Sequence, residues 1–86
     1  MSDEMIQSLK RQLEAKPDDM HLLLNLASWS RRQGDLAESS KLLVRCSRLY
    51  RDEGDVLRAR ACLEQVLRFE PEHAAALKLL RRLPNG

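Results

Sequence analysis

The dipeptide Gly-Asp occurs twice in this sequence, at 34–35 and again 20 residues later at 54–55. Each copy precedes a segment whose apolar residues recur at helical spacing. Glycine provides the left-handed residue that ends one helix, and aspartate accepts hydrogen bonds from the free N–H groups that begin the next. The two copies therefore predict sharp corners at which consecutive helices fold back on one another.

Prolines and acidic residues predict the remaining corners. Pro17 ends a first helix, because the residue before a proline avoids the α region, and Asp18 and Asp19 can cap a second. The Glu-Pro-Glu segment at 70–72 separates the last two helices. The predicted helices cover residues 3–15, 19–33, 36–51, 55–69 and 73–82. Because the connections are short, up-and-down antiparallel packing is expected.

Composition supports an all-α class. Aromatic residues make up only 3% of the 86 residues, and no segment shows the period-two alternation of a half-buried strand. The length suits one small domain over residues 1–86, or a module of a larger assembly. The widest apolar faces predict that the most buried side chains are Leu26, Leu43, Cys46, Tyr50, Ala59, Cys62, Leu63 and Val66. Trp29 lies off the main stripe of its helix and is expected to pack against the first helix.

The two cysteines, Cys46 and Cys62, stand among apolar residues of helical patterns. Buried, reduced thiols are the expected state, with a disulfide or a metal pair as the alternatives. The chain starts with acidic residues in place of a signal peptide, and its longest apolar run, Ala74–Leu77, is four residues, so a cytoplasmic protein without membrane spans is expected.

No pattern in the sequence predicts catalysis. His21 and His73 have no neighbouring cysteine or serine in a nucleophile–base arrangement, and both are expected at the surface. A zinc site assembled from the two cysteines and two histidines would lack ligand spacing, and no glycine-rich phosphate loop is present. The sequence therefore predicts a non-enzymatic protein with no cofactor and no metal.

Basic residues form a stripe on the predicted third helix. Lys41, Arg45 and Arg48 recur at i, i+4 and i+7, although the net charge of the chain is only +2. Arg31, Arg32 and Arg51 extend this stripe, with Arg81 or Arg82 as a further continuation. Leu24 and Val44 are neighbouring apolar residues expected to contribute affinity. The predicted partner-binding residues are Leu24, Arg31, Arg32, Lys41, Val44, Arg45, Arg48 and Arg51.

The segment 43–71 resembles the tetratricopeptide repeat (TPR). The residues that carry the resemblance are Tyr50, Gly54-Asp55, Ala59, Val66 and the closing Phe69-Glu70-Pro71. A second, partial copy is offset by 20 residues instead of the usual 34, so the third helix would serve in two hairpins. The resemblance implies a short TPR-like array of α-hairpins and a protein-binding scaffold whose concave face holds a peptide or a partner helix.

Taken together, these observations predict an adaptor or scaffold module that binds an acidic or amphipathic segment of a partner protein through a basic groove. Two alternatives remain. Arginines beside glycine-containing turns also occur in nucleic-acid-binding helical domains, but the acidic residues at 52, 53 and 55 and the small net charge disfavour this alternative. Self-association through the apolar ends of the array is the second.

Overall fold

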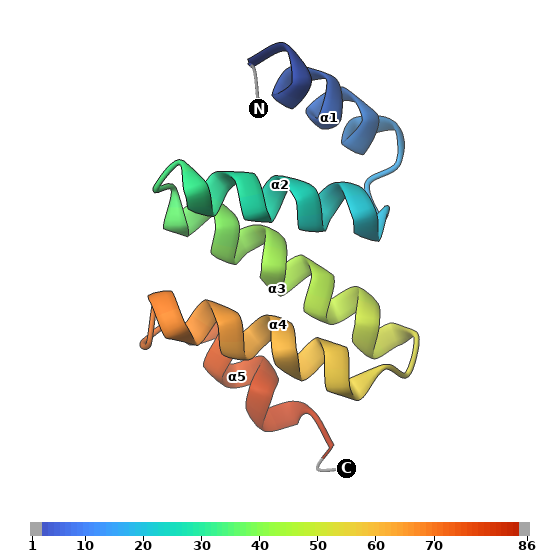
Figure 1. Cartoon of the computed structure of the whole chain (residues 1–86). Helices are drawn as coiled ribbons and strands as arrows, with labels where there is room; N and C mark the ends of the chain where they lie inside the picture. The colour runs from blue at the N-terminus through green and yellow to red at the C-terminus, as the bar shows by residue number, and fades with distance from the viewer. Residues whose placement is uncertain (1–2, 85–86) are drawn as a thin grey trace.

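The computed structural model describes residues 3–84, which form five α-helices stacked in chain order (Figure 1). The helices are α1 (Asp3–Ala15), α2 (Met20–Arg32), α3 (Leu36–Asp52), α4 (Val56–Phe69) and α5 (Ala74–Arg82). The described part of the chain contains no strand. The predicted all-α class with five helices is confirmed, and each predicted helix end lies within one residue of the observed one.

The two Gly-Asp corners have the same geometry, and both end one helix and begin the next. Gly34 has a φ of 82° and Gly54 a φ of 80°. At the second corner the amide of Gly54 donates to the carbonyl of Arg51 at 2.9 Å, and the amide of Asp55 donates to the carbonyl of Tyr50 at 2.8 Å. This pair of bonds is a Schellman motif. The carboxylate of Asp55 then accepts from the amide of Arg58 at 3.1 Å and caps α4.

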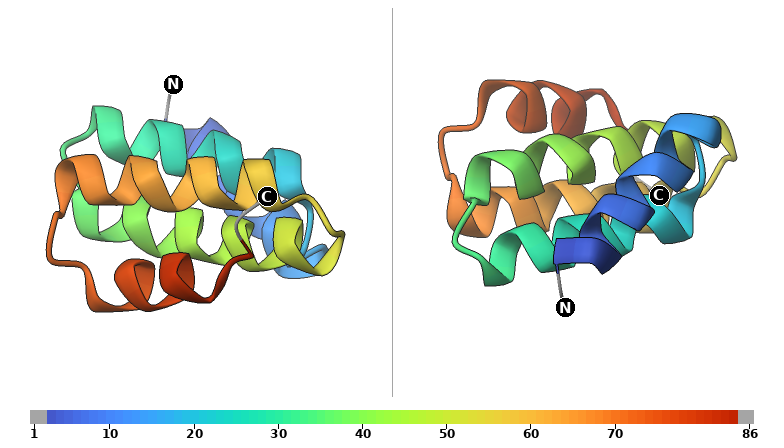
Figure 2. Two further views of the ribbon diagram at one scale, coloured as in Figure 1. Left: turned by 90° about the horizontal axis from the view of Figure 1, so that it is seen from below. Right: turned by 90° about the horizontal axis from the view of Figure 1, so that it is seen from above.

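The stack has two layers. Both views in Figure 2 show α2 and α4 on one side of the molecule and α3 and α5 on the other, with α1 crossing obliquely at the N-terminal end. The extents of 41 × 26 × 15 Å describe the resulting thin slab. Because α3 packs extensively on both α2 and α4, it is the central helix of the stack.

The core follows the predicted apolar faces closely, with one difference. Leu63 and Cys46 have at most 1% of their surface exposed, and seven of the eight residues predicted to be most buried are buried. The prediction for Tyr50 was wrong, since it is only half-buried near the end of α3. In α5, Leu79 is buried, whereas Leu77 and Leu80 are half-buried.

The helix α3 is buried on more of its circumference than its stripe predicted. Leu42, Val44, Ser40 and Ser47 are buried in addition to the expected face. The reason is its central position, because a helix with neighbours on several sides has little free surface. Ser47 satisfies its buried hydroxyl locally by donating to the carbonyl of Val44 at 2.7 Å. None of the helices described has the length and apolar character that crossing a bilayer requires.

Candidate functional site

A groove between α3 and the start of α5 contains half of the predicted partner-binding residues. Lys41, Val44, Arg45 and Arg48 line it from α3, and His73 and Ala75 line it from the other side. Its volume is about 430 Å³. We refer to these six residues as the basic groove. Three cationic side chains from successive turns of one helix thus line one wall, which favours an anionic occupant.

The charged side chains of the basic groove differ in whether they already form an ion pair. Arg45 lies 3.5 Å from a carboxylate oxygen of Asp18, in the connection between α1 and α2, and both side chains are largely exposed. Such exposed pairs stabilise by about 0.2–1 kcal/mol. Lys41 and Arg48 are exposed and make no ion pair within residues 3–84. They are therefore the charges most available to a partner.

His73 is held in a fixed orientation where it enters the basic groove. Its Nδ1 accepts a hydrogen bond of 3.2 Å from the amide of Ala76, and so it caps α5. Its Nε2 lies 4.0 Å from a carboxylate oxygen of Glu70. His73 was expected at the surface with no role, but it is half-buried. The sequence did contain a signal for this role. His73 follows Pro71 by two residues and directly precedes an alanine-rich segment, which is where a residue that caps a helix is expected.

The other four predicted residues do not line the basic groove. The guanidinium of Arg31 lies 5.8 Å from the ring centroid of Phe69, on the layer formed by α2 and α4. Arg32 is exposed in the last turn of α2, and Arg51 lies 3.4 Å from its neighbour Asp52. Leu24 is half-buried and packs against the core. The continuous stripe expected from α2 to α3 is thus divided between the two layers.

The apolar members of the site also differ from expectation. Val44 is only 7% exposed, so it forms the floor of the basic groove and offers little contact area. Arg81 and Arg82 lie in a separate hollow on α5 with Leu77 and Lys78. The three cations Lys41, Arg45 and Arg48 therefore distinguish the basic groove.

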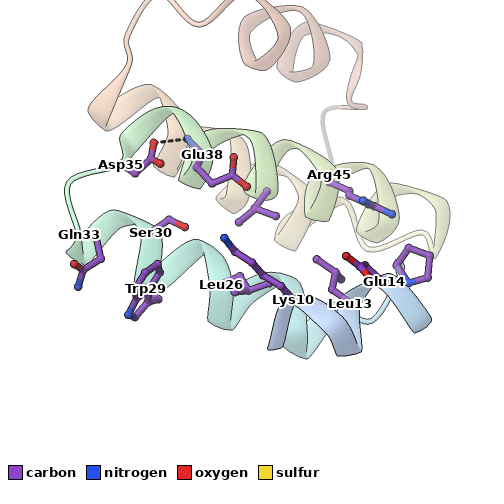
Figure 3. Close-up of a pocket in the computed structure, with 12 residues that line it drawn as sticks. Lys10, Leu13, Glu14, Leu26, Trp29, Ser30, Gln33, Asp35, Glu38 and Arg45 are labelled. Carbon is purple, nitrogen blue, oxygen red and sulfur yellow. Dashed lines mark hydrogen bonds between the residues drawn. The ribbon is translucent and has the colours of Figure 1, made fainter. Parts of the chain in front are cut away.

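A second and larger groove of about 720 Å³ lies between α1, α2 and α3 (Figure 3). Its apolar residues are Leu13, Pro17, Leu26, Trp29 and Leu42. We refer to it as the tryptophan groove. No sequence pattern predicted this groove. Trp29, which was expected to pack against the first helix, lines the groove together with Leu13 of α1. The Nε1–H group of Trp29 is buried and has no hydrogen-bond partner in the described part of the chain.

The chemistry of the two cysteines is that of buried thiols. Cys46 and Cys62 are both free and buried. Desolvation by burial raises the pKa of Cys46 from 9.0 to about 12 and that of Cys62 to about 11. Thiols in this state are poor nucleophiles at neutral pH. Within residues 3–84, no cluster of three histidine, cysteine or acidic side chains is arranged to hold a metal ion.

The fold defines the class of protein as an all-α stack of antiparallel helices with two surface grooves of different character. No protein-family model matches the chain, and no curated protein matches it significantly in sequence. The two grooves are therefore the features of this chain that bear on its function.

Proposed function

We propose that this protein is a non-enzymatic interaction module, an adaptor or scaffold, that binds an acidic or amphipathic segment of a partner protein in the basic groove. The observation that carries the proposal is the convergence of Lys41, Arg45 and Arg48 on one groove wall opposite the start of α5. Two of these cations have no acidic partner within the described residues. An acidic segment would supply the missing countercharge.

The resemblance to tetratricopeptide repeats supports the same proposal. Arrays of this kind present a concave face formed by every second helix, and α3 and α5 share one layer here (Figure 2). The 20-residue offset between the Gly-Asp corners is a departure from the regular repeat. The TPR-like assignment is thus part of the proposal, as is a cytoplasmic location, which two unpaired, buried thiols favour.

The binding strength expected for this site is modest. Exposed ion pairs contribute about 0.2–1 kcal/mol each, and Val44 is buried. The cations would mainly set the orientation of the partner and the association rate, and a dissociation constant on the order of micromolar is expected. Binding should weaken moderately as salt is added.

The proposal can be tested with a synthetic acidic amphipathic peptide, in which leucines and glutamates occupy opposite faces of a helix. Binding is measured by anisotropy of the labelled peptide for the parent protein and for a Lys41→Glu/Arg48→Glu variant. The reversal should weaken binding about tenfold or more. Arg45 is left unchanged because its pair with Asp18 connects two parts of the fold.

The matched control is Arg11→Glu/Arg68→Glu, which changes net charge equally at exposed positions outside both grooves. If both double variants lost binding equally, the effect would come from net charge, and the basic groove would not be the site.

Tight binding of random duplex DNA with a steep salt dependence, abolished by the Lys41/Arg48 reversal alone, would favour the nucleic-acid alternative.

A further inference from the structure

The tryptophan groove has the opposite charge character from the basic groove. Its charged lining residues are Lys10, Glu14, Asp35, Glu38 and Arg45. Arg45 is already paired with Asp18 at 3.5 Å. The lining as a whole holds three carboxylates and two cations, an excess of one negative charge around an apolar floor.

The carboxylates lie at both ends of this groove. Figure 3 shows Asp35 and Glu38 at one end and Glu14 near the other, with Lys10 extending across the middle. The Asp35 carboxylate accepts from the amide of Glu38 at 3.1 Å as the cap of α3. The side chains of Glu14 and Glu38 are exposed and make no hydrogen bond or ion pair with the rest of the described chain. Both are available to an incoming cation.

The walls of the tryptophan groove restrict the form of its occupant. Most of its lining residues lie in helices, whose interior backbone N–H and C=O groups are bonded within the helix, so an extended strand would find few backbone partners there. A helix satisfies its own backbone and binds through side chains on one face. Leu13 and Trp29 are half-buried and provide apolar contact area for such a face, whereas the buried Leu26 and Leu42 form the floor of the groove. A volume of about 720 Å³ accommodates several inserted side chains.

We propose that the tryptophan groove binds a cationic amphipathic helix of a partner protein. The apolar face of that helix lies on Leu13 and Trp29, above the floor formed by Leu26 and Leu42, and its basic residues pair with Glu14 and Glu38. This site is distinct from the basic groove and takes a partner of opposite charge. The two grooves meet only at Arg45, which lines both. A module with both sites would join an acidic and a basic partner segment on adjacent surfaces.

The chain contains its own reporter for this site, because Trp29 is the single tryptophan and lies in the groove wall. The probe is a synthetic helix with leucines on one face and lysines on the other, compared with the same helix carrying glutamates in place of lysines. The lysine helix should change the intensity and wavelength of Trp29 emission in a saturable manner. The glutamate helix should bind at least about tenfold more weakly at this site.

A charge reversal identifies the residues involved. The Glu14→Lys/Glu38→Lys variant should lose binding of the lysine helix by about tenfold or more, whereas Glu53→Lys/Glu64→Lys, with the same change in net charge at exposed positions outside the groove, should retain it. Circular dichroism establishes that each variant folds. Because the altered side chains of the first variant make no bonds within the described chain, folding should persist.

Three results would overturn the proposal. The first is equal binding of the lysine and glutamate helices, and the second is equal loss of binding in the two double variants. The third is a change of Trp29 emission with protein concentration in the absence of peptide, if the Glu14→Lys/Glu38→Lys variant does not show it. The occupant of the groove would then be a second copy of this chain. The Lys41→Glu/Arg48→Glu variant should bind the lysine helix normally, so failure at one groove is distinguishable from failure at the other.

Discussion

The hydroxyl of Ser39 on α3 donates a hydrogen bond of 2.9 Å to the carbonyl oxygen of Ala27 on α2, and both residues are buried. This bond joins two helices across their interface, where small side chains allow the backbones to approach closely. The α2–α3 interface is therefore held by a specific polar contact in addition to apolar packing.

Replacing Ser39 tests this contact. Ser39→Ala removes the donor but leaves the Ala27 carbonyl within its helix, so the free energy of unfolding should fall by about 0.5–1.5 kcal/mol. Ser39→Leu should cost about 1–3 kcal/mol or more, because added methylenes do not fit a packed interface. Urea unfolding of both variants gives the comparison. An equal effect of the two substitutions would contradict the proposed close approach.

Truncation of core leucines should destabilise the protein strongly. Leu43 is 4% exposed and Leu63 is 1% exposed, and each lies in the central cluster. Either change to alanine should cost about 2–5 kcal/mol, which approaches the entire stability expected of a small domain. The matched control is Leu57→Ala on α4, because Leu57 is 75% exposed. Thermal melts in which Leu57→Ala is as damaging as Leu63→Ala would show that the apolar face of α4 points the other way.

The glycine at each corner is required by backbone conformation alone. An added Cβ at Gly54 would meet no atom within 4 Å, yet the φ of 80° is unfavourable for side-chain-bearing residues. Gly54→Ala should therefore cost about 1–2 kcal/mol. Gly54→Asn should cost less, because asparagine tolerates the left-handed region. Chemical unfolding of the two variants measures the difference, and a harmless Gly54→Ala would contradict the Schellman corner.

Stability should decline at alkaline pH because of the buried thiols. Burial raises the pKa of Cys46 to about 12 and of Cys62 to about 11, whereas the ordinary value is 9.0. The folded state keeps these protons while the unfolded chain releases them, so their contribution is fully present below pH 9 and is lost as the pH rises toward the folded-state values. Urea unfolding at a series of pH values measures the slope.

The control for this prediction is the Cys46→Ala/Cys62→Ala variant, which should be less stable overall but should show a flatter decline above about pH 9. Tyr50 should contribute to the same decline, because desolvation, followed by the charge of Cys62, also raises its pKa above the ordinary value. An unchanged slope in the double variant would mean that the thiols are not responsible.

The sequence by itself determined the helices and their corners, since these depend on interactions within a few residues. Gly34 and Gly54 adopt positive φ, and the neighbouring aspartates cap the following helices as expected. Helical periodicity likewise identified most of the core, because a residue three or four positions from another apolar residue lies on the same helix face.

Only the tertiary structure decided which helix faces meet to form grooves. Arg31 and Lys41 looked like members of one stripe, but α2 and α3 lie in different layers, and Arg31 contacts Phe69 instead. Val44 is buried because α3 has neighbouring helices on several sides. Tyr50 is partly exposed because it lies in the last turn of α3, where fewer side chains are buried. The tryptophan groove requires three helices at once, and no local pattern in the sequence encodes the crossing of α1 that forms it.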